Sequence, residues 1–191
     1  NLEVVAAMLE AGVQIIQYRE KDKKLLYKYE ECTVLRRLTQ EAGATFIVND
    51  DIHLAMAVGA DGVHIGQEDL PLPQVRKLVG EKMIIGLSTH SPAQAQAAVM
   101  QGADYIGVGP LFSTKTKKDV CDPVGLEYLD YAVQHVPIPF VAIGGIKEHN
   151  ITQVVQRGAK CIALVTDIVG ASDIKKKIAV LRDSMNKERS L

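Results

Sequence analysis

The feature that most constrains this chain is a recurring junction, in which a glycine ends a helical pattern and an apolar run follows. Glycine readily takes the left-handed backbone conformation that ends many helices. Each junction therefore predicts a helix that turns into a strand. The strands are apolar on both faces, which is typical of a parallel sheet covered by helices. The junctions lie at Gly12, Gly43, Gly59, Gly102 and Gly158.

The spacing of apolar residues places the elements around these junctions. Apolar residues recur at intervals of three and four in the predicted helices, whereas the predicted strands are short runs rich in isoleucine and valine. We expect helices at residues 2–10, 24–41, 52–58, 71–79, 92–101, 126–136, 151–157 and 174–187, and strands at 13–18, 45–48, 62–65, 83–87, 104–109, 139–143 and 160–165.

The alternation of strands with helices predicts an α/β fold, and glycines at several strand ends favour a closed (β/α)8 TIM barrel. Because a helix comes first and seven strands are predicted, the first strand of the barrel is expected to be missing from the chain as given. A seven-stranded or open sheet is the alternative. We expect residues 1–191 to form a single TIM-barrel catalytic domain, since this length suffices for one substantial core.

The composition narrows the classes of partner. The net charge is −1, with acidic and basic residues mixed along the chain, so we expect small-molecule substrates and neither nucleic acid nor a membrane. No apolar run approaches the roughly 20 residues that cross a bilayer. The three cysteines lack CxxC spacing, which suits a reducing compartment and predicts a cytoplasmic protein.

Polar residues gather where the predicted strands end, which is the functional face of a TIM barrel. They include cations, hydroxyl groups and glycines, and together these predict a site for phosphate-bearing ligands. The alternatives are a surface cluster of ion pairs around Arg19 and a solvated charged loop at residues 114–119. The candidate residues are Arg19, Lys21, Ser88, Thr114, Thr116, Lys117, Gly145 and positions 165–166.

Two aspartates at strand ends, Asp50 and Asp69, do not suit an anion site by themselves. They fit if they hold Mg²⁺, which takes one or two carboxylates and leaves its other positions to water and phosphate oxygens. The alternative is helix capping, because each aspartate also stands just before a predicted helix. At this point both interpretations stay open.

Six motifs, in order and spacing, resemble the thiamine-phosphate synthase family: "QYREKD", "FIVNDD", "GVHIGQED", "GLSTHS", "YIGVGPLFSTKTKKD" and "VAIGGI". The resemblance runs from about Val13 to the end of the chain. It implies a TIM barrel that uses Mg²⁺ to join hydroxymethylpyrimidine diphosphate to hydroxyethylthiazole phosphate, giving thiamine phosphate and pyrophosphate. It also implies a dissociative mechanism, in which pyrophosphate leaves before the thiazole nitrogen attacks.

The resemblance also implies roles for individual residues. Asp50 and Asp69 match the magnesium ligands, and Arg19, Lys21, Ser88 and Lys117 are the expected catalytic groups. The family shows a small residue where this chain has Asp167, so its charge is expected to weaken phosphate binding. The expected pyrimidine diphosphate binders are Gln17, Tyr18, Arg19, Glu20, Lys21, Asn49, Ser88 and Lys117, and the expected thiazole phosphate binders are Thr114, Lys115, Thr116, Gly145, Val165 and Thr166.

Other functions compete with this one. A related barrel, thiazole tautomerase, would use His90 as an acid or base. A non-catalytic metabolite-binding barrel would keep the ligand groups without turnover, and a sugar-phosphate isomerase would leave the paired acids unexplained. A homodimer is possible, with Tyr128, Tyr131 and the apolar side of residues 126–136 as contributors.

Overall fold

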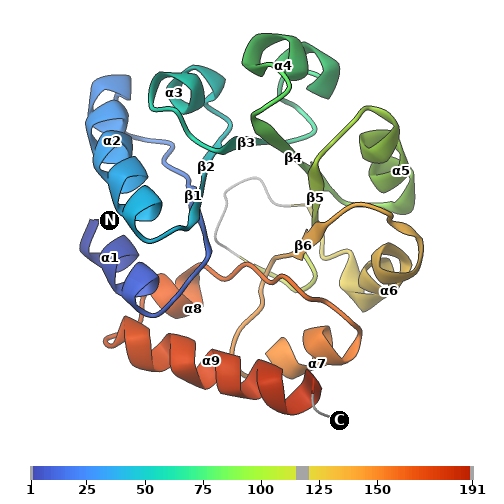
Figure 1. Ribbon diagram of the computed structural model, residues 1–191. Coiled ribbons are helices and arrows are strands. Elements are labelled where there is room, and N and C mark those ends of the chain that lie inside the picture. The colour runs from blue at the N-terminus through green and yellow to red at the C-terminus, as the bar shows by residue number, and fades with distance from the viewer. Residues whose placement is uncertain (1, 115–120, 190–191) are drawn as a thin grey trace. The chain divides into compact units, whose positions relative to one another are not determined.

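The structure is a computed structural model that describes residues 2–114 and 121–189. The chain forms two compact units, Asn1–Leu87 and Ser88–Leu191, which are treated one at a time. In the described part of the chain, no helix is both long enough and apolar enough to cross a membrane. Figure 1 labels the elements in chain order.

The first unit alternates helices with parallel strands. Each strand pairs with the next one along the chain, from β1 to β4, and β4 continues past the unit boundary by two residues. The elements are α1 (Leu2–Glu10), β1 (Ile15–Tyr18), α2 (Leu25–Glu41), β2 (Thr45–Asn49), α3 (Ile52–Ala57), β3 (Gly62–Ile65), α4 (Leu72–Val79) and β4 (Ile84–Thr89).

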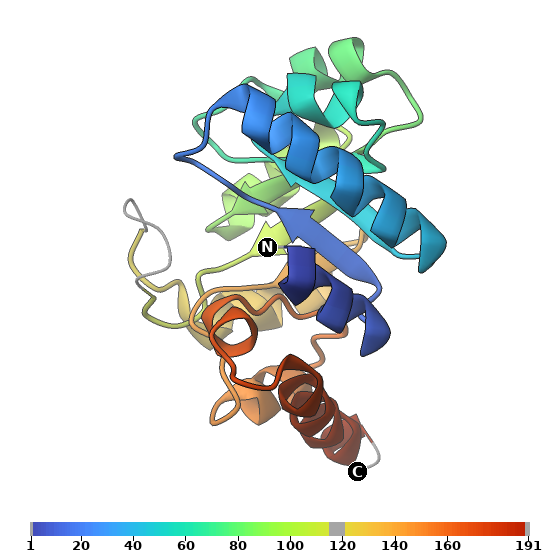
Figure 2. The same cartoon turned by 90° about the vertical axis from the view of Figure 1, so that its left-hand side faces the viewer.

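The core of the first unit lies along these strands. Val48 faces Val63 across β2 and β3, and Val63 faces Ile85 across β3 and β4. All three side chains are fully buried, so their burial contributes strongly to the stability of the sheet through the hydrophobic effect. Helix α2 runs alongside β2 (Figure 2). Because the strands are parallel, the loops after β1, β2 and β3 leave from the same end of the sheet.

The second unit continues the alternation. Strands β5 and β6 are parallel, with Ile106 opposite Phe140 and Val108 opposite Ala142. Helices α8 and α9 are neighbours, as are α7 and α9 (Figure 1). The elements are α5 (Pro92–Met100), β5 (Tyr105–Val108), α6 (Gly125–His135), β6 (Phe140–Ala142), α7 (Ile151–Gln156), α8 (Thr166–Val169) and α9 (Ile174–Arg189).

The structure confirms the junction pattern and the α/β class. All five junction glycines have positive φ, from 61° at Gly59 to 97° at Gly158. The predicted strand at 160–165 is wrong, because within the described residues this segment makes one isolated bridge, between Ile162 and Ala142. Strand β6 ends at Ala142, and Gly144 then turns the chain with a φ of 98°. The short helix α8 was not predicted.

Candidate active site

The two aspartates that follow β2 have different roles. Asp51 caps α3, since its side chain accepts a hydrogen bond from the Leu54 N–H at 3.3 Å. Asp50 has a φ of 63°, and its own N–H donates to the His64 carbonyl at 2.8 Å. Its carboxylate pairs with the Lys21 ammonium group. The capping interpretation therefore applies to Asp51, and the Asp50 side chain is turned to a cation.

Asp69 does not cap a helix either. Helix α4 begins after Pro71 with no side-chain cap, and the Asp69 carboxylate instead accepts from the Gly66 N–H at 2.7 Å. Burial, the charge of Asp50 and a hydrogen bond with Asp50 raise the pKa of Asp69, while the Gly66 N–H and the charge of Lys21 act in the opposite direction. The first unit thus brings Asp50, Asp69 and Lys21 together.

This arrangement fits a divalent cation. Two carboxylates that share a site repel each other, and a positive charge between them relieves both the repulsion and the loss of water. Among the residues that the structure describes, no group of three or more His, Cys, Asp or Glu side chains could hold a metal. A two-carboxylate site suits Mg²⁺, which keeps several water molecules and takes phosphate oxygens as its remaining ligands.

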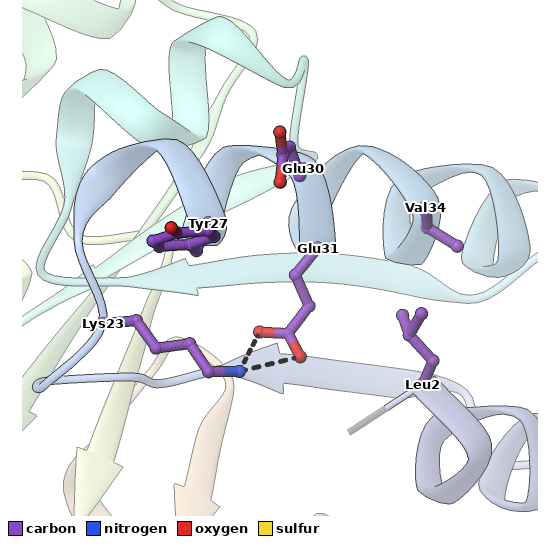
Figure 3. Close-up of a pocket in the computed structure, with 6 residues that line it drawn as sticks. All are labelled: Leu2, Lys23, Tyr27, Glu30, Glu31 and Val34. Carbon is purple, nitrogen blue, oxygen red and sulfur yellow. Dashed lines mark hydrogen bonds and ion pairs between the residues drawn. The ribbon is translucent and has the colours of Figure 1, made fainter.

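The loop after β1 is anchored to α2 by Glu31, a residue that sequence reasoning missed. The Tyr18 hydroxyl donates to Glu31 Oε2 at 2.7 Å. Lys23 Nζ donates to both oxygens of the same carboxylate, at 2.9 and 3.1 Å, as Figure 3 shows. Burial and Glu31 raise the pKa of Tyr18. The Glu20 carboxylate accepts from the Asp22 N–H at 2.9 Å. The side chains of Tyr18 and Glu20 therefore hold the loop.

Other predicted binders of the first unit lie at the same end of the strands. Gln17 is exposed, on the face of β1 opposite the buried Tyr18. Arg19 is also exposed, and Asn49 is half-buried at the end of β2. A separate groove between α1 and α2 contains none of the predicted binders (Figure 3). It is lined by Leu2, Lys23, Tyr27, Glu30, Glu31 and Val34.

In the second unit, the end of β4 is fixed by hydrogen bonds. The buried Tyr128 hydroxyl donates to Thr89 Oγ1 at 2.6 Å, and Thr89 donates to the Gly107 carbonyl at 2.8 Å. His90 Nδ1 lies 2.6 Å from the Gly109 carbonyl oxygen, so this nitrogen must carry the proton. Ser88, a predicted binder, directly precedes Thr89 in the sequence. Its side chain is half-buried, and the residue has an interaction partner.

The paired glycines after β6 form a tight turn against the loop that follows β5. The Phe112 N–H donates to the Gly144 carbonyl at 3.0 Å. At Gly145, where φ is 66°, a Cβ would lie 2.6 Å from the Ser113 carbonyl oxygen. Asn150 closes the turn, because its side chain donates to the Gly145 carbonyl at 3.0 Å and accepts from the Lys147 N–H at 2.7 Å. No other residue fits at position 145 without moving this backbone.

The remaining predicted phosphate binders are divided between described and undescribed residues. Thr114 is half-buried and has a partner. Val165 and Thr166 are exposed at the start of α8. Lys115, Thr116 and Lys117 lie outside the described residues.

The charge of Asp167 is accommodated by neighbours. Its Oδ2 accepts from the Glu148 N–H at 3.0 Å and lies 3.5 Å from Lys177 Nζ. The negative charge that the sequence placed near the predicted phosphate site is therefore partly offset by a cation of α9, which is shared with Glu148.

The chain is similar to thiamine-phosphate synthases in sequence, and it resembles a related solved structure in fold. The model of a family described as thiamine monophosphate synthase matches residues 1–168. A thiamine-phosphate synthase of Pelotomaculum thermopropionicum is 69% identical over 182 residues, which cover 95% of this chain and 84% of that protein. One from Lawsonia intracellularis is 58% identical over 184 residues, covering 96% and 85%. A solved thiamine phosphate pyrophosphorylase from Pyrococcus furiosus has a TM-score of 0.91 at 38% identity, covering 98% of this chain and 90% of that chain.

Proposed function

The chain belongs to the thiamine monophosphate synthase family and is a transferase of thiamine biosynthesis, and on this premise we propose the reaction that it carries out. It joins hydroxymethylpyrimidine diphosphate to hydroxyethylthiazole phosphate, releasing pyrophosphate and forming thiamine phosphate. The bond from the pyrimidine methylene carbon to the diphosphate oxygen breaks, and a bond from that carbon to the thiazole nitrogen forms. No side-chain nucleophile is needed for this exchange.

One observation supports the diphosphate half of this proposal most strongly, and it is the meeting of Asp50, Asp69 and Lys21 in the first unit. Asp50 and Asp69 would hold Mg²⁺, which when bound neutralises charge that develops on a departing diphosphate. Lys21 and Arg19 would bind the diphosphate oxygens as further cations. Gln17 and Asn49, at the same end of the strands, would orient the pyrimidine.

The thiazole phosphate is assigned to the second unit. Backbone N–H groups of Gly145, Val165 and Thr166, with the Thr114 hydroxyl, would bind its phosphate oxygens. The rigid turn that Asn150 closes around Gly145 supports this, because preorganised donors bind an anion without reordering cost. The roles of Ser88, Lys115, Thr116 and Lys117 stay predictions from the family resemblance.

The architecture and setting are part of the same proposal. We infer a (β/α)8 TIM barrel from the alternation of helices with parallel strands in both units. A cytoplasmic location and a homodimer stay predictions, as does the absence of nucleic acid or membrane partners.

The test uses the purified chain with both substrates. Pyrophosphate release and thiamine phosphate formation should proceed only when Mg²⁺ is present, and EDTA should abolish both. Pyrophosphate release without formation of thiamine phosphate, when both substrates are present, would contradict the proposed coupling. Isomerisation of a thiazole carboxylate phosphate, without use of the pyrimidine diphosphate, would favour a tautomerase instead.

A further inference from the structure

Asp167 connects two segments of the second unit that are distant in the sequence. It lies in the first turn of α8, directly after Thr166, and only 19% of its side chain is exposed. Its Oδ2 accepts from the Glu148 N–H at 3.0 Å. Glu148 stands three residues beyond Gly145, in the segment that Asn150 holds. One carboxylate therefore ties the start of α8 to the glycine turn.

Lys177 of α9 completes a network of three residues. Its ammonium group donates to Glu148 Oε2 at 2.7 Å and lies 3.5 Å from Asp167 Oδ2. Its side chain is 24% exposed. The hydrogen bond with Glu148 and the charges of Asp167 and Glu148 raise the pKa of Lys177, so it stays charged at neutral pH. Two carboxylates from different segments thus share one cation.

The electrostatic meaning follows from the position of this network. A carboxylate next to backbone donors for a phosphate would repel that phosphate, since like charges a few ångströms apart interact even near the protein surface. Lys177 offsets part of this charge, because it is shared with Glu148, and it does so without occupying the backbone N–H groups at Gly145 and Thr166. The network therefore gains a rigid connection while weakening the repulsion that an unpaired Asp167 would cause.

We propose that Asp167 and Lys177 are positioning residues for the phosphate-bearing substrate, with Asp167 tying the glycine turn to α8 and Lys177 neutralising Asp167. This rests on the proposed function, which places the thiazole phosphate at Gly145 and Thr166. Neither residue touches the reacting atoms. They act on how tightly one of the two substrates is held.

The experiment compares steady-state kinetics for both substrates in four variants and the parent protein. In Lys177→Met, the KM for thiazole phosphate should rise about three- to fivefold, the scale of one partly exposed charge interaction. The KM for the pyrimidine diphosphate and the saturated turnover should stay within about twofold. Lys176→Met, an exposed neighbour that changes the net charge equally, should behave as the parent does.

The remaining two variants separate charge from packing. Lys177→Arg keeps the cation and should keep the parent KM. Asp167→Asn combined with Lys177→Met removes the less exposed of the two carboxylates, the one next to Thr166, so the KM for thiazole phosphate should return most of the way to the parent value. A purely structural connection would predict the reverse, because the double variant loses more contacts than the single one.

The possible failures can be told apart. An active parent protein in which Lys177→Met matches Lys176→Met, or raises both KM values equally, would overturn this inference alone. A double variant with a KM no lower than that of Lys177→Met would do the same. A parent protein that releases no pyrophosphate from the two substrates would overturn the proposed function, and this inference with it.

Discussion

The Lys21 ammonium group pairs with the Asp50 carboxylate, so a cation of the loop after β1 is held by the first carboxylate after β2. Asp50 also hydrogen-bonds with Asp69, which makes it the centre of a cluster of two carboxyl groups and one ammonium group. Lys21 is the counter-ion of this cluster. We expect Mg²⁺ to take its place and to leave Lys21 to the diphosphate.

Lys21→Met should separate these two roles. Removing the competing ammonium should strengthen Mg²⁺ binding to the substrate-free protein about threefold, whereas turnover should fall because a cation for the diphosphate is lost. Isothermal titration with Mg²⁺ and a pyrophosphate release assay measure the two effects. Lys24→Met, an exposed neighbour in the same loop, is the control for net charge. Weaker Mg²⁺ binding in Lys21→Met than in this control would contradict the exchange.

Asp50→Asn tests the metal site without disturbing the backbone, because asparagine tolerates the positive φ at this position. Turnover should fall by the equivalent of about 2–4 kcal/mol in barrier, the loss typical of one preorganised electrostatic contact. Asp51→Asn is the matched control, since asparagine is also a good helix cap. It should change turnover less than about threefold. Equal losses in both variants would argue against a special role for Asp50.

The raised pKa of Asp69 predicts a pH dependence of stability in the metal-free protein. A carboxyl group with a higher pKa in the folded state contributes stability below its unfolded pKa, and this is lost as the pH rises through the folded pKa. Asp69→Asn has no carboxyl group to titrate there. Its free energy of unfolding should therefore increase relative to that of the parent protein as the pH rises. Urea denaturation at several pH values measures this.

Magnesium provides the second arm of the same test. Because the metal favours the charged carboxylate, saturating Mg²⁺ should stabilise the parent protein at neutral pH and leave Asp69→Asn nearly unchanged. If the stability of the variant depended on pH as that of the parent protein does, the folded state would not raise the pKa of the Asp69 carboxyl group.

Tyr18→Phe should destabilise the first unit by about 1.5–3 kcal/mol, because the buried hydroxyl donates to the charged Glu31 carboxylate. The measurement is chemical denaturation. Tyr27→Phe is the control, since Tyr27 lies on α2, the helix that carries Glu31, and is 59% exposed. If both variants lost the same stability, the Tyr18–Glu31 bond would not be what anchors the loop.

Gly145→Ala should cost about 2–4 kcal/mol of folding stability, because it combines a positive φ with a clash against the Ser113 carbonyl. Gly59→Ala isolates the first of these effects, since its φ is 61° and a Cβ there meets nothing within 4 Å. It should cost only about 1 kcal/mol. Chemical denaturation compares the two, and an equal loss would mean that the turn at Gly145 relaxes.

The sequence by itself determined the elements, the order in which they follow one another and the strand ends that carry polar residues. This was possible because a glycine after a helix and an apolar run after the glycine are local signals, set by backbone sterics and by hydrophobic periodicity. The same logic failed at 160–165, which among the described residues makes a single β-bridge, between Ile162 and Ala142. Whether an apolar run becomes a strand depends on a neighbour that the run does not encode.

Only the tertiary structure decided which polar groups meet. Asp50 and Asp51 are adjacent and chemically identical, and one pairs with Lys21 while the other caps α3 because the backbone is left-handed at Asp50 and not at Asp51. Glu31 and Lys177 lie in predicted helices, where no sequence motif separates them from the other charged residues of the same helix. Their partners, Tyr18 and Asp167, are 13 and 10 residues away, and contacts over such separations depend on packing that no local pattern specifies.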